Sequence, residues 1–180
     1  MKNFTKWASR EYSFTTRLLA MLPAGVLFVL LIPYALIYPI PKLDALLHLP
    51  SLSYGIVNII LGGLLMVVGA FYGQWSIVSQ FTRARGTPLP VMATQTLLVS
   101  GPFKQCRNPM SFGTFCLYGG IGILVGSISS IATVALFAAL LLTYIKLVEE
   151  RELAARFGQA YLEYKAKTPL IIPRIFPRKP

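Results

Sequence analysis

Four long apolar stretches, separated by short polar or proline-rich segments, dominate the pattern along this chain. They cover residues 18–38, 54–77, 110–126 and 131–148. Each is long enough to cross the ~30 Å hydrocarbon core of a bilayer as a helix. Pro23 and Pro33 fall inside the first stretch and predict a kinked helix, which membrane helices tolerate. The pattern therefore predicts an all-α, polytopic membrane protein with about four transmembrane helices.

Composition supports the same class. Of the 180 residues, 55% are hydrophobic and only 13% charged, against ~25% charged in soluble domains, and the mean hydropathy is +0.63. We expect a single membrane domain over residues 1–180. Two spans lie in 1–85, and a connector, a helical hairpin and a tail lie in 86–180. No cleavable signal peptide is expected, because the first apolar stretch is too long for one.

The net charge of +11, from 17 basic and 6 acidic residues, predicts the orientation. In the four-span topology every basic residue except Lys42 falls on one side of the membrane. Basic residues collect in cytoplasmic loops and near anionic lipids. We therefore expect both termini, the connector and the tail in the cytoplasm, and no nucleic-acid partner.

The last two apolar stretches predict a hairpin that brings two polar clusters together. Residues 127–130 supply a short turn, so the two helices should be antiparallel neighbours. Each arm is ~27–28 Å long at 1.5 Å per residue. Asn108, in the cluster at 101–110, and Glu149, in the cluster at 149–153, should therefore end at the same height, at the cytoplasmic membrane boundary.

Both clusters contain groups that suit a polar ligand. Asn108 followed by Pro109 is typical of a helix start, where free N–H groups attract anions, and Arg107 could bind a carboxylate. The alternative is that Asn108 only caps the helix and Arg107 binds a lipid phosphate. Glu149 could bind a ligand that carries a positive charge or a ribose. The alternative is a solvated helix start, with Lys146 and Glu150 as an i,i+4 pair.

Three further features give narrower expectations. Aromatic residues at 157, 161 and 164, with a helix break at Gly158, could pack against the hairpin or wall an adenine. The long connector at 79–107 is expected to be irregular, and loops of this length are often functional. The glycine pairs Gly69/Gly73 and Gly122/Gly126 predict close helix packing and would permit a homo-oligomer. Neither a disulfide between Cys106 and Cys116 nor a metal site is expected.

Two ordered motifs carry a family resemblance. The first reads Leu97, Leu98, Val99, Ser100, Gly101, Pro102, Phe103, then Arg107, Asn108, Pro109, Met110, Ser111. The second reads Glu149, Glu150, Leu153, Phe157, Gly158, Tyr161, Tyr164, then Pro173 and Arg174. Over residues 86–174 the chain resembles the integral-membrane methyltransferases, a family that includes isoprenylcysteine carboxyl methyltransferases and phospholipid N-methyltransferases.

The resemblance implies an S-adenosylmethionine pocket on the cytoplasmic face. It also implies a lipophilic methyl acceptor that enters from the bilayer: a phospholipid amine, an isoprenoid or prenylcysteine carboxylate, or a thiol. The implied catalytic residues are Arg107, Asn108 and Glu150. The implied cofactor-binding residues are Gln95, Thr96, Leu97, Leu98, Phe103, Asn108, Pro109, Met110, Ser111 and Glu149.

The chain departs from the family pattern at three points. Asn108 and Ser111 replace the usual histidine and tyrosine, and an asparagine cannot act as a general base. Ile145 and Lys146 stand where the prenylcysteine branch has a substrate-binding arginine, which weakens a prenylcysteine acceptor. Two alternatives stay open: an NADPH-dependent membrane reductase with a related hairpin, and a non-enzymatic lipid-binding subunit.

Overall fold

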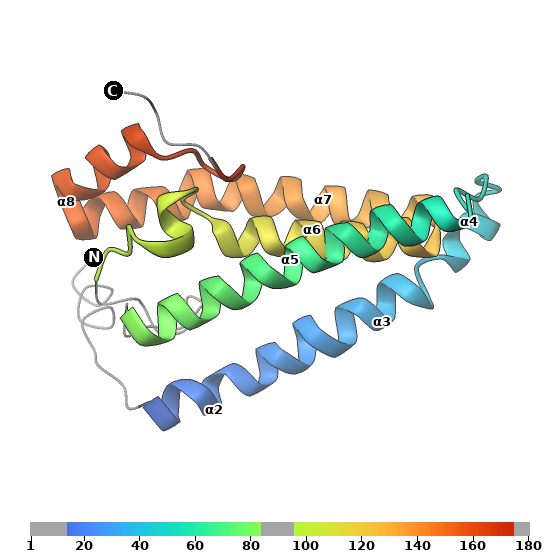
Figure 1. The fold of residues 1–180 in the computed structure, drawn as a ribbon, viewed down its shortest axis with the longest axis horizontal. Coiled ribbons are helices and arrows are strands. Elements are labelled where there is room, and N and C mark those ends of the chain that lie inside the picture. Colours follow the sequence, from blue (N-terminus) through green and yellow to red (C-terminus); the bar gives the residue numbers. More distant parts are fainter. Residues whose placement is uncertain (1–13, 84–95, 175–180) are drawn as a thin grey trace.

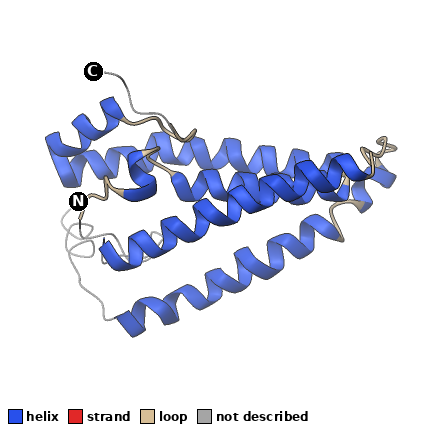
Figure 2. Cartoon of the chain, in the orientation of Figure 1, coloured by secondary structure: helices blue, strands red, loops and turns tan. Residues whose placement is uncertain are grey.

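A computed structural model describes residues 14–83 and 96–174, and within these ranges the chain forms helices and loops without strands (Figure 2). The elements in chain order are α2 (Phe14–Gly25), the π-helical η1 (Val26–Leu31), α3 (Ile32–Ile37), α4 (Lys42–Leu46), α5 (Ile56–Arg83), the 3₁₀ turn η2 (Gly101–Lys104), α6 (Pro109–Val125), α7 (Ile128–Tyr144), the π-helical η3 (Ile145–Glu149) and α8 (Glu150–Lys167).

The helices confirm the predicted membrane fold. Among the described residues, three helical segments are long and apolar enough to cross a bilayer: Met21–Leu46, Ile56–Arg83 and Ile128–Lys167. The apolar helix Pro109–Val125 is shorter. Two boundaries were predicted wrongly. Helix α5 continues through residues 79–83, which were expected to be irregular, and α7 already begins at Ile128, so the hairpin turn is shorter than 127–130.

The prolines of the first span disturb the helix in a specific way. The π-helical segment η1 lies between Pro23 and Pro33. Pro33 has no N–H to donate to the carbonyl four residues earlier, and the N–H of Ile32 donates to Leu27 O, five residues back. The expected kink is therefore a stretch of wider helix rather than a break.

Glycines bring α5 and α6 into close contact. A Cβ on Gly69 would lie 2.4 Å from Leu117 N and 2.6 Å from Gly113 O, and one on Gly120 would lie 2.6 Å from Gly62 O. The packing role expected for Gly69 is confirmed. Its expected partner Gly73 has open space around its own Cβ position. The backbone of Gly73 nevertheless lies at this contact, because a Cβ on Gly113 would lie 2.7 Å from Gly73 N. The other expected pair, Gly122 and Gly126, does not contribute to the α5–α6 contact. Gly122 packs against Ile131 of α7, and Gly126 ends α6 in the left-handed conformation.

One end of the bundle is fastened by the buried amide of Asn58 and the partly exposed carboxylate of Asp44. The Asn58 side chain donates to Leu52 O (2.9 Å) and Ile123 O (2.5 Å) and accepts from Tyr54 N (2.7 Å). The Asp44 carboxylate accepts from Ser129 N (2.8 Å), where it also complements the positive end of the α7 dipole. These bonds fix the turn end of the hairpin, so that its open end lies at the opposite end of the molecule.

The open end of the hairpin lies beside the end of α5, with η2 and α8 next to it (Figure 1). Helix α2 diverges from α5 toward this end (Figure 1), whereas η1 and α3 are hydrogen-bonded to the hairpin. Tyr118 OH donates to Phe28 O (2.7 Å) and Ser130 Oγ donates to Leu36 O (2.8 Å). The two polar clusters therefore lie at the end of the bundle where α2 is separated from α5 (Figure 1).

Candidate functional site

The two polar clusters meet at the open end of the hairpin, as their spacing predicted. The Arg107 guanidinium pairs with the Glu150 carboxylate, although the two residues are 43 positions apart. The second oxygen of Glu150 accepts from Lys165 Nζ at 2.6 Å. The Arg107 and Glu150 side chains are only 11% and 10% exposed, so the pair is largely removed from water. Glu150 therefore pairs with Arg107 and Lys165, and not with Lys146 as in the i,i+4 alternative.

Arg107 also holds the segment that follows α8. Its Nε donates to Thr168 O (3.1 Å) and its backbone N–H donates to Pro169 O (2.9 Å). Tyr161 OH accepts a longer bond of 3.5 Å from the guanidinium. Nε and Nη1 of the arginine thus both donate to groups of the chain itself, and the residue joins the start of α6 to the tail.

Asn108 is bonded in a way that the sequence did not predict. Pro109 does occupy the first turn of α6, but the Asn108 side chain forms no capping hydrogen bond. Its backbone N–H and its Nδ2 both donate to Leu170 O, each at 3.1 Å. Arg174 N donates to Gln105 O nearby (2.9 Å). Residues 105–108 and 168–174 therefore run side by side, and the amide of Asn108 is one of the links.

A small cavity of about 20 Å³ lies beneath this connection. It is lined by Arg107, Asn108, Ile145, Glu149, Glu150, Leu153, Tyr161 and Tyr164. A space of this size accommodates about one water molecule. Ile145, Glu149 and Leu153 follow each other at helical intervals of four, which places them on one face.

The adjacent carboxyl groups Glu149 and Glu150 differ in their electrostatics. Both lie just beyond the apolar residues 131–148. Burial, together with the charges of Glu152 and Glu150, raises the pKa of Glu149 to about 6. Burial acts in the same direction on Glu150, but the hydrogen bond from Lys165 and the charge of Arg107 outweigh it and lower the pKa of that carboxyl. No donor among the described residues pairs with Glu149. A cavity-lining carboxyl with a raised pKa and no partner is a candidate ligand group.

The other candidates from the sequence do not line the cavity. Thr96, Leu97 and Leu98 precede η2, and Thr96 Oγ1 donates to Arg83 O at 3.4 Å. Phe103 supplies a backbone oxygen that accepts from Tyr164 OH (2.6 Å). Pro109, Met110 and Ser111 form the first turn of α6. Gln95 and the glycine-proline segment 86–90 lie outside the described residues.

The remaining wall of the cavity was only weakly indicated by the sequence. The break expected at Gly158 is present (φ 54°, ψ −132°), and it divides α8 into two parts. The second part carries Tyr161, Tyr164 and Lys165. In the sequence, only the spacing of the two tyrosines indicated that this part could line the cavity. The tail contributes backbone carbonyls, which no side-chain pattern reveals.

Comparisons with known proteins identify the family. The family model for phospholipid methyltransferases matches residues 57–160, which include both polar clusters. Over 80 residues the chain is 34% identical to the cobalt-zinc-cadmium resistance protein CzcN of Cupriavidus metallidurans, covering 44% of this chain and 37% of that protein. Over 102 residues it is 29% identical to methanethiol S-methyltransferase 2 of Bradyrhizobium diazoefficiens, covering 55% of this chain and 36% of that protein. The chain thus matches little more than a third of either relative. Since the family model covers more than half of the 180 residues, the chain belongs to the phospholipid methyltransferase family.

Proposed function

We propose that this membrane protein transfers a methyl group from S-adenosylmethionine to a lipophilic acceptor, at a site on the cytoplasmic membrane face. The observation that carries the proposal is the half-buried Glu149 carboxyl, unpaired among the described residues, beside the Arg107–Glu150 pair, in a chain of a methyltransferase family. The topology inferred from charge puts this end of the bundle, and both termini, in the cytoplasm.

The chemistry of the pocket suits this cofactor. S-adenosylmethionine carries two cationic groups and ribose hydroxyls, which a carboxylate at Glu149 would attract. The rings of Tyr161 and Tyr164 and the apolar Ile145 and Leu153 offer an apolar wall for its adenine. A cavity of about 20 Å³ is too small for the molecule. Binding therefore requires the walls of the cavity to move apart, and we propose that the part of α8 after Gly158 moves, because the helix is interrupted at that glycine.

Residue roles follow from the contacts. Glu149 is proposed to touch the cofactor, and Arg107, Asn108 and Glu150 are proposed to position the pocket walls and the tail. Residues 95–98, Phe103 and 109–111 remain proposed cofactor-binding residues on the family resemblance. The cofactor supplies an electrophilic methyl group, so the protein chiefly has to hold donor and acceptor in line. That task does not need a general base at Asn108.

The acceptor is proposed only as a class. The family name points to a phospholipid, and one relative is named for a small thiol. The neutral amine of a phospholipid and a thiolate are good nucleophiles, and each forms when the acceptor loses its proton to water before the methyl group is transferred. An isoprenoid carboxylate is the third candidate.

Thermal unfolding of the purified protein in detergent tests the cofactor class. Saturating S-adenosylhomocysteine at ~100 times its Kd should stabilise the native state by about 2.7 kcal/mol. For a chain of this size, that raises the unfolding midpoint by roughly 5 °C or more. NADPH should have no effect. Stabilisation by NADPH alone would favour a reductase, and stabilisation by neither compound would favour a non-enzymatic subunit.

A further inference from the structure

The part of α8 after Gly158 is held against the rest of the molecule by two short side-chain bonds. Tyr164 OH donates to Phe103 O at 2.6 Å. Lys165 Nζ donates to Glu150 Oε2, also at 2.6 Å, and this bond joins two charged groups. Both bonds must break if this part of the helix moves outward from the cavity.

The lysine can leave Glu150 without leaving the carboxylate unpaired. The other oxygen of Glu150 pairs with Arg107, and these two side chains are 10% and 11% exposed. The Lys165 side chain is 43% exposed. When it moves away, its ammonium enters water, and the buried carboxylate keeps the arginine. The large cost of leaving a buried charge alone therefore does not arise, and Lys165 is the removable partner of Glu150.

The departure of the lysine also changes the charge beside Glu149. When that carboxyl is ionised, the cations Arg107 and Lys165 balance the carboxylates of Glu149 and Glu150. Without the lysine, one negative charge remains beside the cavity. A cationic ligand is therefore attracted more strongly to the open arrangement than to the closed one.

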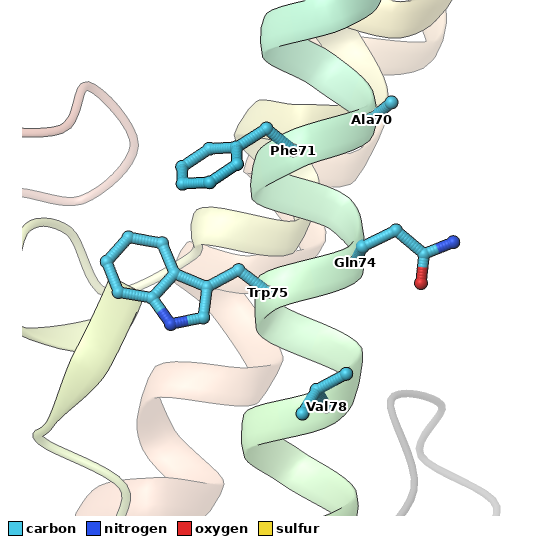
Figure 3. Close-up of a pocket in the computed structure, with 5 residues that line it drawn as sticks. All are labelled: Ala70, Phe71, Gln74, Trp75 and Val78. Atoms are coloured by element: carbon cyan, nitrogen blue, oxygen red, sulfur yellow. The ribbon is translucent and has the colours of Figure 1, made fainter.

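A larger hollow on the outer face of α5 lacks these charges. It has a volume of about 560 Å³ and is lined by Ala70, Phe71, Gln74, Trp75 and Val78 (Figure 3). None of these residues lines the Glu149 cavity, and none carries a charge. The larger volume therefore offers no partner for a cationic group, and such a group has to enter the small cavity through the movement of its walls.

We propose that the Lys165–Glu150 ion pair keeps the cavity closed and must break before a cationic cofactor can enter. Lys165 is then a positioning residue that controls access to the site through Glu150, although it lies outside both sequence motifs. The inference rests on the proposed cofactor role of the cavity. It predicts that the affinity for the cofactor is limited by the fraction of molecules in which this ion pair is open.

The thiol of Cys106 allows the opening to be measured without a cofactor. It is fully buried, and burial raises its pKa to about 12. Since the thiolate is the reactive form, the closed protein should react slowly with a maleimide. Tyr164 lies near this thiol, which contributes with burial to the raised pKa of the tyrosine. An outward movement of Tyr164 therefore uncovers Cys106.

Labelling of the full chain in detergent with N-ethylmaleimide tests the proposal, and peptide mass spectrometry separates Cys106 from Cys116. We expect Lys165→Met to react about three- to tenfold faster at Cys106, because a partly exposed bond between charges is lost. The matched control Lys167→Met removes the same charge from an exposed position and should react as the wild type does. Cys116, on α6, should react equally in all three proteins.

Calorimetry with S-adenosylhomocysteine provides the second measurement. Lys165→Met should bind about three- to tenfold more tightly, because a larger fraction of the molecules is open, and Lys167→Met should bind as the wild type does. A merely structural lysine predicts the reverse, a lower unfolding midpoint together with weaker binding. Labelling is carried out well below the midpoint of each variant, so that global unfolding does not contribute.

An unchanged reaction rate at Cys106 would overturn the proposal, and so would faster labelling combined with unchanged or weaker binding. If no variant binds S-adenosylhomocysteine while Lys165→Met still labels faster, the ion pair does close the cavity and the proposed function is wrong. If Lys165→Met fails to fold, Tyr164→Phe replaces it. That variant loses the bond to Phe103 O but keeps the ring, and it should also label faster at Cys106.

Discussion

Replacing Glu149 with glutamine is expected to weaken S-adenosylhomocysteine binding about 10- to 100-fold while it stabilises the protein. A hydrogen bond to a charged group contributes about 1.5–3 kcal/mol, and each 1.4 kcal/mol is a factor of ten in affinity. Isothermal calorimetry in detergent measures this loss. Glu163→Gln, on an exposed position of α8, is the matched control and should bind as the wild type does.

The stability gain follows from the raised pKa of Glu149, about 6 against an ordinary 4.5. Below pH 4 the carboxyl is neutral in the folded and unfolded states, and its burial carries no charge penalty. Well above pH 6 it is charged in both states, and the full penalty is present. Glu149→Gln should therefore match the wild type near pH 4 and exceed its unfolding free energy by about 1–2 kcal/mol at pH 8.

Glu150→Gln should have the opposite effect on stability. It removes the charge that pairs with Arg107 and Lys165, and loss of one partner of a buried pair costs about 3 kcal/mol. The contrast separates the roles of two neighbours on one helix. If Glu149→Gln also destabilises the protein and leaves the affinity unchanged, Glu149 is a structural residue and the assignment to the cofactor is wrong.

Gly69→Leu is expected to be the most destabilising single change in the α5–α6 interface. Even a Cβ at Gly69 would lie 2.4–2.8 Å from backbone atoms of Leu117 and Gly113, and backbone atoms cannot rotate away as side chains can. The helices must separate, which costs about 3 kcal/mol or more. Displacing α6 would also move Arg107, so cofactor binding should fall with stability. Thermal unfolding in detergent measures the first effect.

Gly63 and Gly119 provide matched controls on the same two helices. Neither has an atom within 4 Å of its Cβ position, so Gly63→Leu and Gly119→Leu should be neutral or slightly stabilising, because glycine is a poor helix former. Equal losses in all three variants would mean that helix–lipid contacts, rather than the glycine contact between α5 and α6, determine stability.

What could be predicted from the sequence was determined by spacing. Two apolar arms of equal length and a short turn suffice to place residues 107–108 beside residues 149–150. Pro109 and Gly158 mark a helix start and a helix break through their backbone restrictions. The membrane fold rests on apolar length, which a bilayer makes decisive.

What could not be predicted depends on backbone acceptors and on rotation about the helix axis. Asn108 is a good capping residue by type, yet the carbonyl of Leu170 takes its amide. Glu149 and Glu150 have the same side chain but lie on different sides of the helix. Glu150 therefore pairs with Arg107, whereas Glu149 has no partner among the described residues. The glycines that pack α5 on α6 are seven residues apart on each helix, 62 and 69 facing 120 and 113. Glycine pairs spaced four residues apart in the sequence therefore included only Gly69 of these four glycines.

Methyl transfer itself is the most direct test of the account. Membranes containing the protein are incubated with S-adenosylmethionine carrying a labelled methyl group, and the extracted lipids and volatile products are separated and identified. We predict labelled product with the wild type and with Glu163→Gln, and at most a few per cent of it with Glu149→Gln. The central claim would be contradicted if the wild-type protein did not bind S-adenosylhomocysteine and transferred no label to any lipophilic molecule.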